Sequence, residues 1–437
     1  MTLERMTRPA SITAAAVSSH ELSMPRTNTR SHSTRPESRA EVQGRIQDLP
    51  RRHKDTKSHE TLCEPFVSSR LGGKFPRSSP PVLGGLASDV VAYARFPEGE
   101  EMKAAIVREY KQPLQIEETE TPVPGPDEVL IKVEACGVCH SDLHIAEGDW
   151  THLLRIIKRP LIPGHEVVGP IIQKGDTVND LQIGDRVGVA WTHWTCGECE
   201  LCKEGRENLC SKQMITGATV DGGYAEFIKA KASHVLKVPD ALTSEEAAPL
   251  FCAGVTVYHA IKSSAIKPRQ RLVVFGIGGL GHLAVQIAKC FGAQVIAVDI
   301  ADDKLEFAKR LGADITMNAA SEEVVKQIRK LGGAHVAVVT SAAKQAYDMA
   351  FYAVRSSGTL MVVGMPAEDL SFPAIMMREM RIMSSATGTR EDMREVLELA
   401  AAGRVKCQVE TRSLEEVNEV FEEMRSAKIT GRVVLMM

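Results

Sequence analysis

The pattern of hydrophobic and polar positions changes twice along the chain. Residues 1–99 are rich in Arg, Ser, Thr, Pro and His and show no sustained hydrophobic periodicity. Such a segment buries too little apolar surface to offset the entropy lost on ordering, so we expect a disordered basic extension. Short alternating runs begin at Met102, and after residue 250 strand-like runs alternate with helix-like ones.

Residues 100–250 contain short runs in which apolar and polar positions alternate, as they do in half-buried strands. Turn signals such as Pro-Gly-Pro at 124–126 separate these runs. The predicted strands are Met102–Val107, Glu128–Glu134, Val167–Gln173, Arg186–Trp191 and Tyr224–Lys229. Many short strands with Gly and Pro turns predict a compact β-rich domain.

Residues 251–387 show strands and helices in alternation, which predicts an α/β fold. The predicted strands are Arg271–Phe275, Gln294–Asp299, His335–Thr340 and Gly358–Gly364, and the predicted helices are Leu280–Phe291, Asp302–Leu311 and Gln345–Val354. This alternation implies right-handed crossovers and a parallel sheet covered on both faces. Residues 388–437 form a C-terminal segment with two predicted helices, Glu391–Ala402 and Leu414–Ser426, and a last strand, Arg432–Met436.

A glycine-rich motif follows the first strand of the α/β part. The motif is Gly276-Ile-Gly278-Gly279-Leu280-Gly281, a G-x-G-x-x-G sequence that leads into a predicted helix. The first glycine allows a tight turn, the second lets the backbone approach a pyrophosphate, and the third lets the helix pack on the strand. Amides at the helix N-terminus would then bind the phosphates of a dinucleotide.

An acidic residue, Asp299, ends the next predicted strand, 18 residues after Gly281. A carboxylate there accepts hydrogen bonds from the adenine-ribose hydroxyls and repels a 2′-phosphate, so we expect NAD rather than NADP. The alternative is a glycine turn with an unrelated surface Asp. Lys304, on the following helix, either contributes on the ribose side or is a solvated lysine.

Four cysteines lie within one 15-residue stretch. They are Cys196, Cys199, Cys202 and Cys210. Four thiolates at this spacing can close a tetrahedral cage around Zn²⁺ and leave no position for a substrate, which predicts a structural zinc site. An iron–sulfur cluster is the chemical alternative.

Three further candidate metal ligands, Cys139, His165 and Cys252, are dispersed along the chain. Catalytic zinc takes three protein ligands and one open position, and two cysteines with one histidine are a known set. Taken singly, a His or Cys in an apolar stretch is more often a core residue than a metal ligand. Spacing alone does not join the three.

The chain resembles a known family, the zinc-containing medium-chain alcohol dehydrogenases, and especially their tetrameric yeast and bacterial branch that is active on ethanol. The resemblance runs from about Met102 to Met437. The matching segments are Cys136–His144, Gly148–Trp150, Pro163–Glu166, the four-cysteine stretch, Asp221–Tyr224, Cys252–Tyr258, Gly276–Gly281 and Gly431–Arg432. It implies a GroES-like catalytic domain and a Rossmann coenzyme domain with the active site between them, and residues 388–437 returning to the catalytic domain.

The resemblance implies a second, catalytic zinc. Its ligands would be Cys139, His165 and Cys252, with Glu166 close by as a fourth or exchanging ligand. Cys136 is not a ligand in this family and is expected to pack. Two zinc ions per chain follow, one catalytic and one structural.

The resemblance also implies roles in coenzyme binding and proton transfer. Arg432 matches an arginine that contacts the coenzyme pyrophosphate, and Thr256 a residue near the nicotinamide. Ser141 matches the hydroxyl that hydrogen-bonds the alcohol oxygen, and His144 the imidazole that passes the proton to solvent, a role that suits its near-neutral pKa. Arg390 matches no residue of assigned role.

Two tryptophans match positions that narrow the substrate pocket in the ethanol-active branch. These are Trp150 and Trp191, and Met365 is a further candidate for the same wall. Small primary alcohols such as ethanol or propanol are therefore the expected substrates. The loop 151–164 is about three residues longer than this branch usually carries, and it borders the pocket in relatives, so it bears on substrate size.

Two rival interpretations stay open. The first is an NADPH-dependent aldehyde reductase of the cinnamyl-alcohol type, which Gly164–Gly169 would suit but which Asp299 opposes. The second is a zinc-stabilised, dinucleotide-binding protein without enzymatic activity, whose extension docks a partner. The presence of all three catalytic ligands argues against the second.

Composition and charge narrow the classes of partner and compartment. A hydrophobic share of 43% and a net charge of −3 give no reason to expect nucleic acid or an anionic membrane as partner. Ten cysteines without a secretory signal after Met1 favour reduced thiolates in the cytoplasm. A mitochondrial presequence, an untargeted tail and an over-long gene prediction are the options for residues 1–99. The resemblance favours a homotetramer over a dimer.

Overall fold

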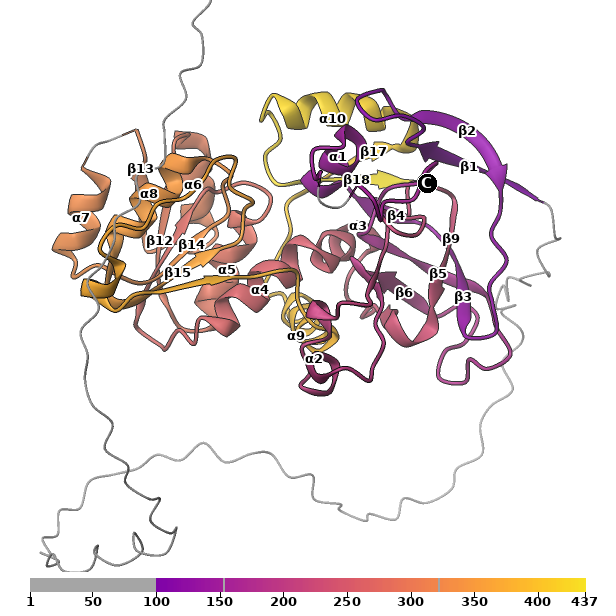
Figure 1. Ribbon diagram of the computed structural model, residues 1–437, viewed down its shortest axis with the longest axis horizontal. Coiled ribbons are helices and arrows are strands. Elements are labelled where there is room, and N and C mark those ends of the chain that lie inside the picture. Colours follow the sequence, from indigo (N-terminus) through magenta and orange to yellow (C-terminus); the bar gives the residue numbers. More distant parts are fainter. Residues whose placement is uncertain (1–99, 152–153, 321–322) are drawn as a thin grey trace, which may run out of the picture. The chain divides into compact units, whose positions relative to one another are not determined.

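The computed structural model describes residues 100–151, 154–320 and 323–437. The expectation of a disordered extension over residues 1–99 lies outside the described residues. Within them, the chain forms two large sheets, one built mainly from residues 100–240 and one from residues 271–384 (Figure 1). No helix of the described ranges is long and apolar enough to cross a membrane.

The first large sheet has eight strands and carries the β-rich half of the chain. Six strands follow the order β10-β6-β5-β4-β18-β17, and β3 pairs with β5 and with β9. Their bounds are β3 Glu128–Lys132, β4 Ala135–Gly137, β5 Val167–Lys174, β6 Arg186–Val189, β9 Phe227–Lys231, β10 Leu236–Lys237, β17 Val409–Ser413 and β18 Arg432–Met436. Two small sheets accompany it, β1 (Glu101–Ile106) with β2 (Gln115–Glu120), and β7 (Thr192–Trp194) with β8 (Met214–Ile215).

The end of the chain belongs to this first sheet. Strand β18 pairs antiparallel with β4, with Val434 opposite Gly137, and parallel with β17. Residues far apart in the sequence thus become neighbours, because the last strand lies beside the segment that leads into α1 (His140–Glu147). This pairing places Arg432 next to the candidate metal site.

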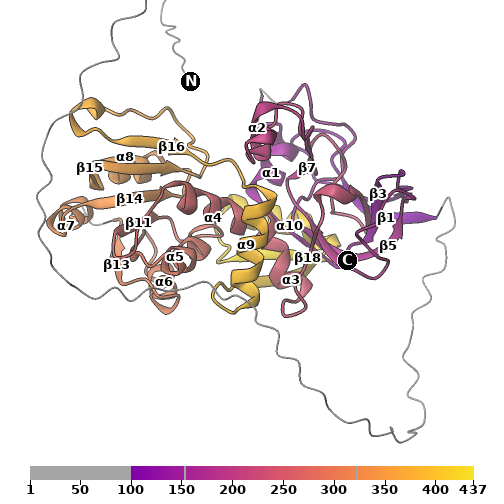
Figure 2. The same cartoon turned by 90° about the horizontal axis from the view of Figure 1, so that it is seen from below.

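The second large sheet is a six-stranded parallel sheet in the order β13-β12-β11-β14-β15-β16. Its strands are β11 Arg271–Phe275, β12 Gln294–Asp299, β13 Ile315–Asn318, β14 Ala334–Val339, β15 Val354–Val362 and β16 Arg381–Ser384. Helices cover it: α4 Ala253–Ser263, α5 Gly281–Cys290, α6 Asp302–Arg310, α7 Val324–Lys330, α8 Lys344–Ala353 and α9 Arg390–Ala401 (Figure 2). This is the doubly wound α/β arrangement that the sequence predicts.

Alternate residues of each central strand face opposite layers of helices. Leu272 and Val274 belong to the same buried cluster as residues of α4, α5 and α9. Val273 and Phe275 belong to another cluster, together with residues of α7 and α8. Because both faces of β11 are buried, its sequence is almost continuously apolar, and this apolar run allowed the strand to be predicted from the sequence.

The remaining helical elements are short, apart from α10. They are α2 Glu200–Lys203, α3 Ser244–Ala247, α10 Val417–Arg425, and the 3-10 turns η1 Glu207–Leu209, η2 Ala232–His234, η3 Ala248–Phe251, η4 Ile375–Arg378 and η5 Leu414–Glu416.

The predicted strands Arg271–Phe275, Gln294–Asp299 and Arg432–Met436 agree with β11, β12 and β18 residue for residue. The strand predicted at Tyr224–Lys229 is displaced to Phe227–Lys231. The backbone N–H of Tyr224 donates to the carbonyl oxygen of Pro163 and its carbonyl oxygen accepts the N–H of Ala105, so Tyr224 does not join the pairing of β9 with β3. The sequence did not predict β2, whose residues Gln115–Glu120 are almost all polar and lack an apolar alternation.

Candidate metal and coenzyme site

Four candidate ligands from three distant segments meet at one buried point. Cys139 is the N-cap of α1, Cys252 the N-cap of α4, and His165 and Glu166 lie just before β5. One ligand atom of each lies within 4.8 Å of those of the other three, and all four residues are buried. The fold thus brings together the residues that spacing alone did not join.

The geometry of this cluster fits zinc. The sulfur atoms of Cys139 and Cys252 lie 3.9 Å apart, and two thiolates bound at about 2.3 Å in a tetrahedron are separated by about 3.8 Å. His165 Nδ1 lies 2.9 Å from Asp142 Oδ1. The other ring nitrogen, Nε2, is buried and makes no hydrogen bond within the described part of the chain. Two sulfurs and an unpartnered imidazole nitrogen are a zinc donor set.

The pKa values of the neighbouring thiols Cys139 and Cys136 are shifted in opposite directions. The pKa of Cys139 lies well below its ordinary value, because the thiol of Cys252 hydrogen-bonds to it and the imidazole of His165 is near. Burial and the carboxylate of Asp142 raise the pKa of Cys136 well above its ordinary value. Cys136 is therefore a neutral thiol and packs in the core, in line with the expectation from the sequence.

Asp142 is a site residue that the sequence reasoning missed. Its fully buried carboxylate accepts hydrogen bonds from the backbone N–H of Cys139 at 3.0 Å and of Gly164 at 3.1 Å, and from the hydroxyl of Tyr224 at 3.0 Å. It also orients His165. A carboxylate bonded to a ligand histidine is a recurring feature of zinc sites, and that rule, applied to the acid three positions after Cys139, could have found it.

Glu166 and Arg432 form a buried ion pair beside the cluster. Arg432 donates to Glu166 Oε1, whereas Oε2 makes no hydrogen bond among the described residues. Burial raises the pKa of Glu166 to about 7, although the guanidinium of Arg432 opposes the shift. Arg432 also lies against the glycine motif, because a Cβ added to Gly279 would be 2.9 Å from Arg432 Cδ. One arginine therefore connects the metal cluster to the motif.

The glycine motif forms the turn that a dinucleotide needs. Gly276 has a φ of 91°, and a Cβ on Gly281 would lie 1.8 Å from the carbonyl oxygen of Gly276. A Cβ on Gly278 would meet nothing within 4 Å, so this glycine faces open space. Asp299 Oδ2 accepts the N–H of Ile277 at 2.6 Å, which holds the carboxylate directly beneath the turn. The residues present fit a phosphate-bridged dinucleotide.

The residues predicted for proton transfer lie on α1. Ser141 Oγ is 3.6 Å from the sulfur of Cys139. His144 lies one turn further along, half-exposed, with its Nδ1 3.1 Å from Asp149 Oδ2. The ring of His144 stacks on Trp150 at a centroid distance of 5.6 Å.

Trp150 and Trp191 lie together beside the metal cluster. Their rings meet edge to face at 6.1 Å, and Trp191 meets the ring of His165 in the same manner at 4.9 Å. An apolar cluster backs the two rings, and it includes residues of the long loop 151–164. Its members are Ile145, Leu154, Ile157, Leu161, Ile215 and Ala218.

The other predicted coenzyme and pocket residues are Thr256, Lys304 and Met365. Thr256 is buried on α4, and its carbonyl oxygen accepts the hydroxyl of Ser385 at 3.4 Å. Lys304 is half-buried on α6. Met365 follows β15 and is 52% exposed, and it is not among the residues packed around the two tryptophans.

The four cysteines within residues 196–210 form a second cluster, in the loop that contains α2 and η1. The sulfur of Cys196 lies 3.9 Å from that of Cys202 and 3.6 Å from that of Cys210, and Cys199 is 4.0 Å from Cys210. These distances fit a tetrahedron of thiolates around one zinc ion. All four positions of such a site come from the protein.

Comparison with known proteins agrees with this geometry. A family model described as the alcohol dehydrogenase GroES-like domain matches residues 125–240, and one described as zinc-binding dehydrogenase matches residues 279–402. An alcohol dehydrogenase of Geobacillus stearothermophilus is 48% identical over 337 residues, which are 76% of this chain and 99% of the relative.

Solved structures with the same fold include an alcohol dehydrogenase and a ketone reductase. The alcohol dehydrogenase of Aeropyrum pernix has a TM-score of 0.72 at 35% identity, covering 77% of this chain and 100% of its own. The acetophenone reductase of Geotrichum candidum, solved in complex with NAD, has a TM-score of 0.72 at 32% identity, covering 79% and 99%.

Proposed function

The chain belongs to the zinc-containing medium-chain alcohol dehydrogenases, and on that premise we propose that it interconverts small primary alcohols and aldehydes with NAD. The activity of an alcohol dehydrogenase follows from the family. The observation that carries the finer proposal is the convergence of Cys139, His165 and Cys252 beneath two tryptophan rings. The imidazole Nε2 of His165 has no hydrogen-bond partner among the described residues, which supports a metal at this place.

Cys139, His165 and Cys252 would hold the catalytic zinc, and the four-cysteine cluster a second, structural one. When bound by these three residues, zinc would supply a Lewis acid that lowers the pKa of the substrate hydroxyl, and hydride leaves a carbon more readily once the attached oxygen has lost its proton. Asp142 keeps His165 in the tautomer whose Nε2 lone pair is free. Glu166, held by Arg432, is the neighbouring group that could exchange onto the metal.

Ser141 and His144 would carry the proton away from the buried site. The hydroxyl of Ser141 lies beside Cys139, so its oxygen can accept a hydrogen bond from the O–H of a substrate alcohol while its own O–H donates one onward. His144 is half-exposed and can release the proton to solvent. The path leads outward because the metal cluster is buried, whereas α1 reaches the surface at His144.

The proposal of NAD rests on Asp299. Its carboxylate is held beneath the glycine turn by backbone N–H groups, so a negative charge is fixed where the adenine ribose would bind. Arg432 and the glycine motif would bind the pyrophosphate. The rival reading as a cinnamyl-alcohol-type reductase is not favoured, because relatives with 44–49% identity are alcohol dehydrogenases.

The preference for small primary alcohols rests on Trp150 and Trp191. Two indole rings beside the metal ligands leave little room for a branched or aromatic substrate. The loop 151–164 adds Leu154, Ile157 and Leu161 to the apolar cluster of these rings, so the loop contributes to the proposed pocket wall.

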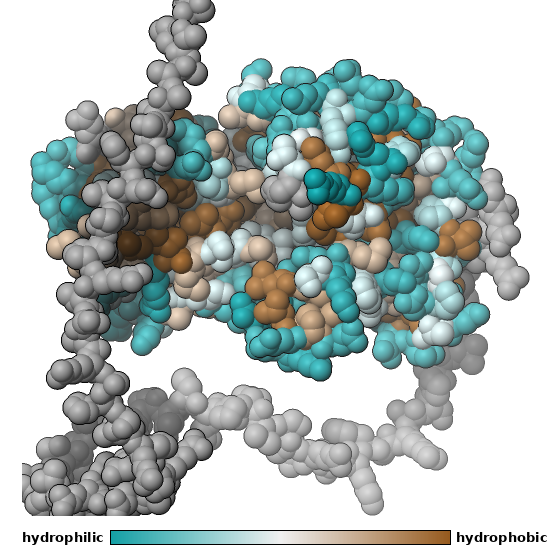
Figure 3. All heavy atoms as spheres, in the orientation of Figure 1, coloured by the Kyte–Doolittle hydropathy of each residue, from teal (hydrophilic) through white to brown (hydrophobic). Residues whose placement is uncertain are grey.

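Self-association and a cytoplasmic location complete the proposal. Strand β16 is an edge of the parallel sheet, and the adjoining η4 presents Met376 and Met377, each 83% exposed. Apolar surface also gathers over this sheet on the face seen in Figure 3. An open strand edge with exposed methionines supports a homo-oligomer. The resemblance to the tetrameric branch of the family favours a tetramer over a dimer, and sedimentation velocity measures the oligomeric state. Two thiolate metal sites favour a reducing compartment.

The first experiment measures the reduction of NAD and of NADP with ethanol, propanol and cinnamyl alcohol, on wild type and Cys139→Ala. We expect turnover with NAD and the small alcohols, and its loss in the variant. Turnover with NADP only would overturn the coenzyme proposal, and a preference for cinnamyl alcohol would overturn the pocket proposal.

A further inference from the structure

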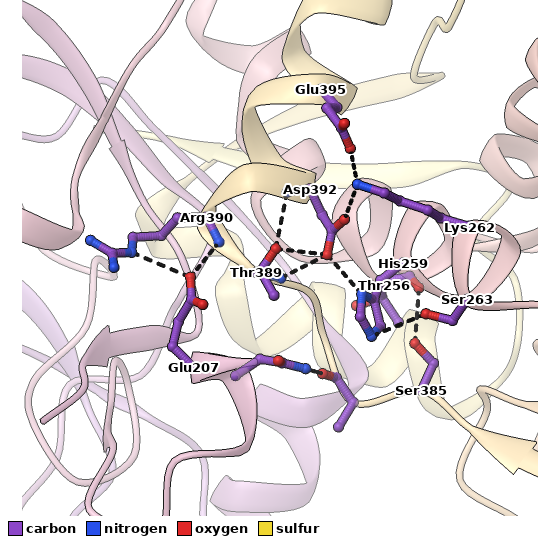
Figure 4. A network of polar contacts seen from close by, with 12 residues as sticks. Glu207, Thr256, His259, Lys262, Ser263, Ser385, Thr389, Arg390, Asp392 and Glu395 are labelled. Carbon is purple, nitrogen blue, oxygen red and sulfur yellow. Dashed lines mark hydrogen bonds and ion pairs between the residues drawn. The ribbon is translucent and has the colours of Figure 1, made fainter. Parts of the chain in front are cut away.

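Residues 196–210 form the four-cysteine lobe. Two residues of this lobe bind the loop 385–390, which connects β16 of the parallel sheet to α9. Glu207 and Asn208 are buried, although the lobe around them is largely exposed. Asn208 Nδ2 donates to the carbonyl oxygen of Ala386 at 3.0 Å. Glu207 Oε1 accepts the backbone N–H of Arg390 at 3.0 Å and lies 3.4 Å from its Nε (Figure 4). The lobe thus holds the loop 385–390 near both of its ends.

Arg390 satisfies a buried carboxylate from another part of the chain. Burial alone would raise the pKa of Glu207, but the N–H and guanidinium of Arg390 outweigh it and keep this pKa below its ordinary value. Arg390 Nη1 also donates to the carbonyl oxygen of Ser233 at 2.6 Å. The guanidinium is therefore held by two residues outside its own loop, Glu207 and Ser233.

The loop 385–390 is packed directly on α4. Ser385, at its start, donates to the carbonyl oxygen of Thr256. Gly388 fits so closely that a Cβ there would lie 2.5 Å from Val255 Cγ2. A displacement of this loop would therefore displace α4.

Helix α9 makes a second connection to α4, through Asp392 in its first turn. Thr389 and Asp392 cap the helix reciprocally. The carboxylate of Asp392 lies 2.7 Å from His259 Nδ1 and 3.0 Å from Lys262 Nζ, both on α4 (Figure 4). Because Cys252 is the N-cap of α4, these contacts extend from the four-cysteine lobe to the helix that follows a member of the ligand cluster.

We propose that Glu207 is a positioning residue for coenzyme binding, which acts through Arg390 to hold the loop 385–390 and α4 in the arrangement that the coenzyme requires. This inference rests on the proposed function, since it takes Cys252 and Thr256 as parts of the substrate and coenzyme site. The four-cysteine lobe then does more than stabilise its own fold, because its buried Glu207 carboxylate binds Arg390 at the end of the loop 385–390.

The test uses the full-length, zinc-loaded protein and the variant Glu207→Gln, which keeps the shape of the side chain and removes its charge. We expect the Kd for NADH and the KM for NAD to rise about five- to fifty-fold, the range of typical coupling between sites. We expect kcat to fall by less than KM rises. The matched control is Glu204→Gln, because Glu204 forms an exposed pair with Arg206 at 3.6 Å in the same lobe.

A second variant, Arg390→Lys, removes the forked guanidinium from the other side. If the two residues act as a unit, the double variant binds NADH no more weakly than the worse single variant. A Kd for NADH equal to that of Glu204→Gln, with unchanged zinc content and only a lower melting temperature, overturns the inference. Should Glu207→Gln not fold, the same comparison is made with Arg390→Lys.

The wild type separates this inference from the proposed function. Wild type that binds NADPH but not NADH contradicts the coenzyme proposal, and the ratio of variant to wild type is then measured with NADPH. The inference about Glu207 is tested only by the ratio of the coenzyme Kd of the variant to that of the wild type.

Discussion

Asp142 Oδ1 lies 2.9 Å from Nδ1 of His165, and both side chains are fully shielded from solvent. The contact makes Nδ1 the protonated nitrogen, so Nε2 presents its lone pair toward the sulfurs of Cys139 and Cys252. A buried carboxylate that already accepts hydrogen bonds from two backbone N–H groups cannot swing away from the ring. The orientation of the His165 ring therefore depends on a residue outside the four-residue cluster of proposed zinc ligands.

The first prediction concerns this orientation. Asp142→Asn should lower the zinc affinity of the catalytic site about 10- to 100-fold, because the amide no longer fixes the tautomer and basicity of His165. Zinc retained against a competing chelator measures the loss. Tyr224→Phe is the matched control, since it removes a different hydrogen bond to the same carboxylate. Equal zinc retention in wild type and Asp142→Asn would contradict the prediction.

The second prediction concerns the four-cysteine cluster. Cys210→Ser should lower the zinc content from two ions per chain to one and lower the melting temperature, because three thiolates no longer close the cage. Elemental analysis and thermal denaturation measure both effects. Cys136→Ser, which changes a buried thiol outside both clusters, should keep two ions. A Cys210→Ser protein that retains two ions would refute the assignment.

The third prediction concerns coenzyme choice. Asp299→Asn should shift the ratio of kcat/KM for NAD over NADP toward NADP by about tenfold or more, because a fixed negative charge no longer repels the 2′-phosphate. Steady-state kinetics with both coenzymes give the ratio. Asp302→Asn, on the first turn of α6, alters a neighbouring exposed carboxylate and should leave the ratio unchanged. An unchanged ratio in Asp299→Asn would remove the argument for NAD.

The fourth prediction concerns acid stability. His282 is buried at the start of α5, with its Nδ1 3.1 Å from the carbonyl oxygen of Gly278 and its Nε2 accepting the N–H of Gln408 at 3.2 Å. Burial lowers its pKa from 6.5 to about 4. The unfolded chain then binds more protons between these values, so stability is lost as pH falls from about 6.5 to about 4.

At most about 3 kcal/mol of this loss comes from His282. His282→Gln should therefore flatten the dependence of unfolding free energy on pH within that window, although it is less stable at neutral pH. Denaturant unfolding at pH 7, 6 and 5 tests it. His335→Gln is the control, because His335 is only partly buried. Parallel pH curves for wild type and His282→Gln would show that another group dominates.

Local patterns allowed much of the molecule to be predicted. Strands β11 and β12 were predicted to the residue because each is a continuous apolar run with turn residues at its end. The glycine motif and the four-cysteine stretch were readable because their members are neighbours in the sequence. The ligand role of Cys139, His165 and Cys252 required the resemblance to a family, since no spacing rule joins residues so far apart.

The sequence alone determined the local features, which are the periodicities of the strands and helices, the glycine-rich turn and the four-cysteine stretch. Each depends on residues within one turn or one loop. Tertiary structure decided which distant side chains meet. Strand β18 carries Arg432 beside β4 and hence to Glu166, the loop before β5 places His165 against Asp142, and α9 brings Arg390 to Glu207. These contacts follow from strand pairing and helix packing, which are set by the sum of many burial and register choices, so no short stretch of sequence specifies them.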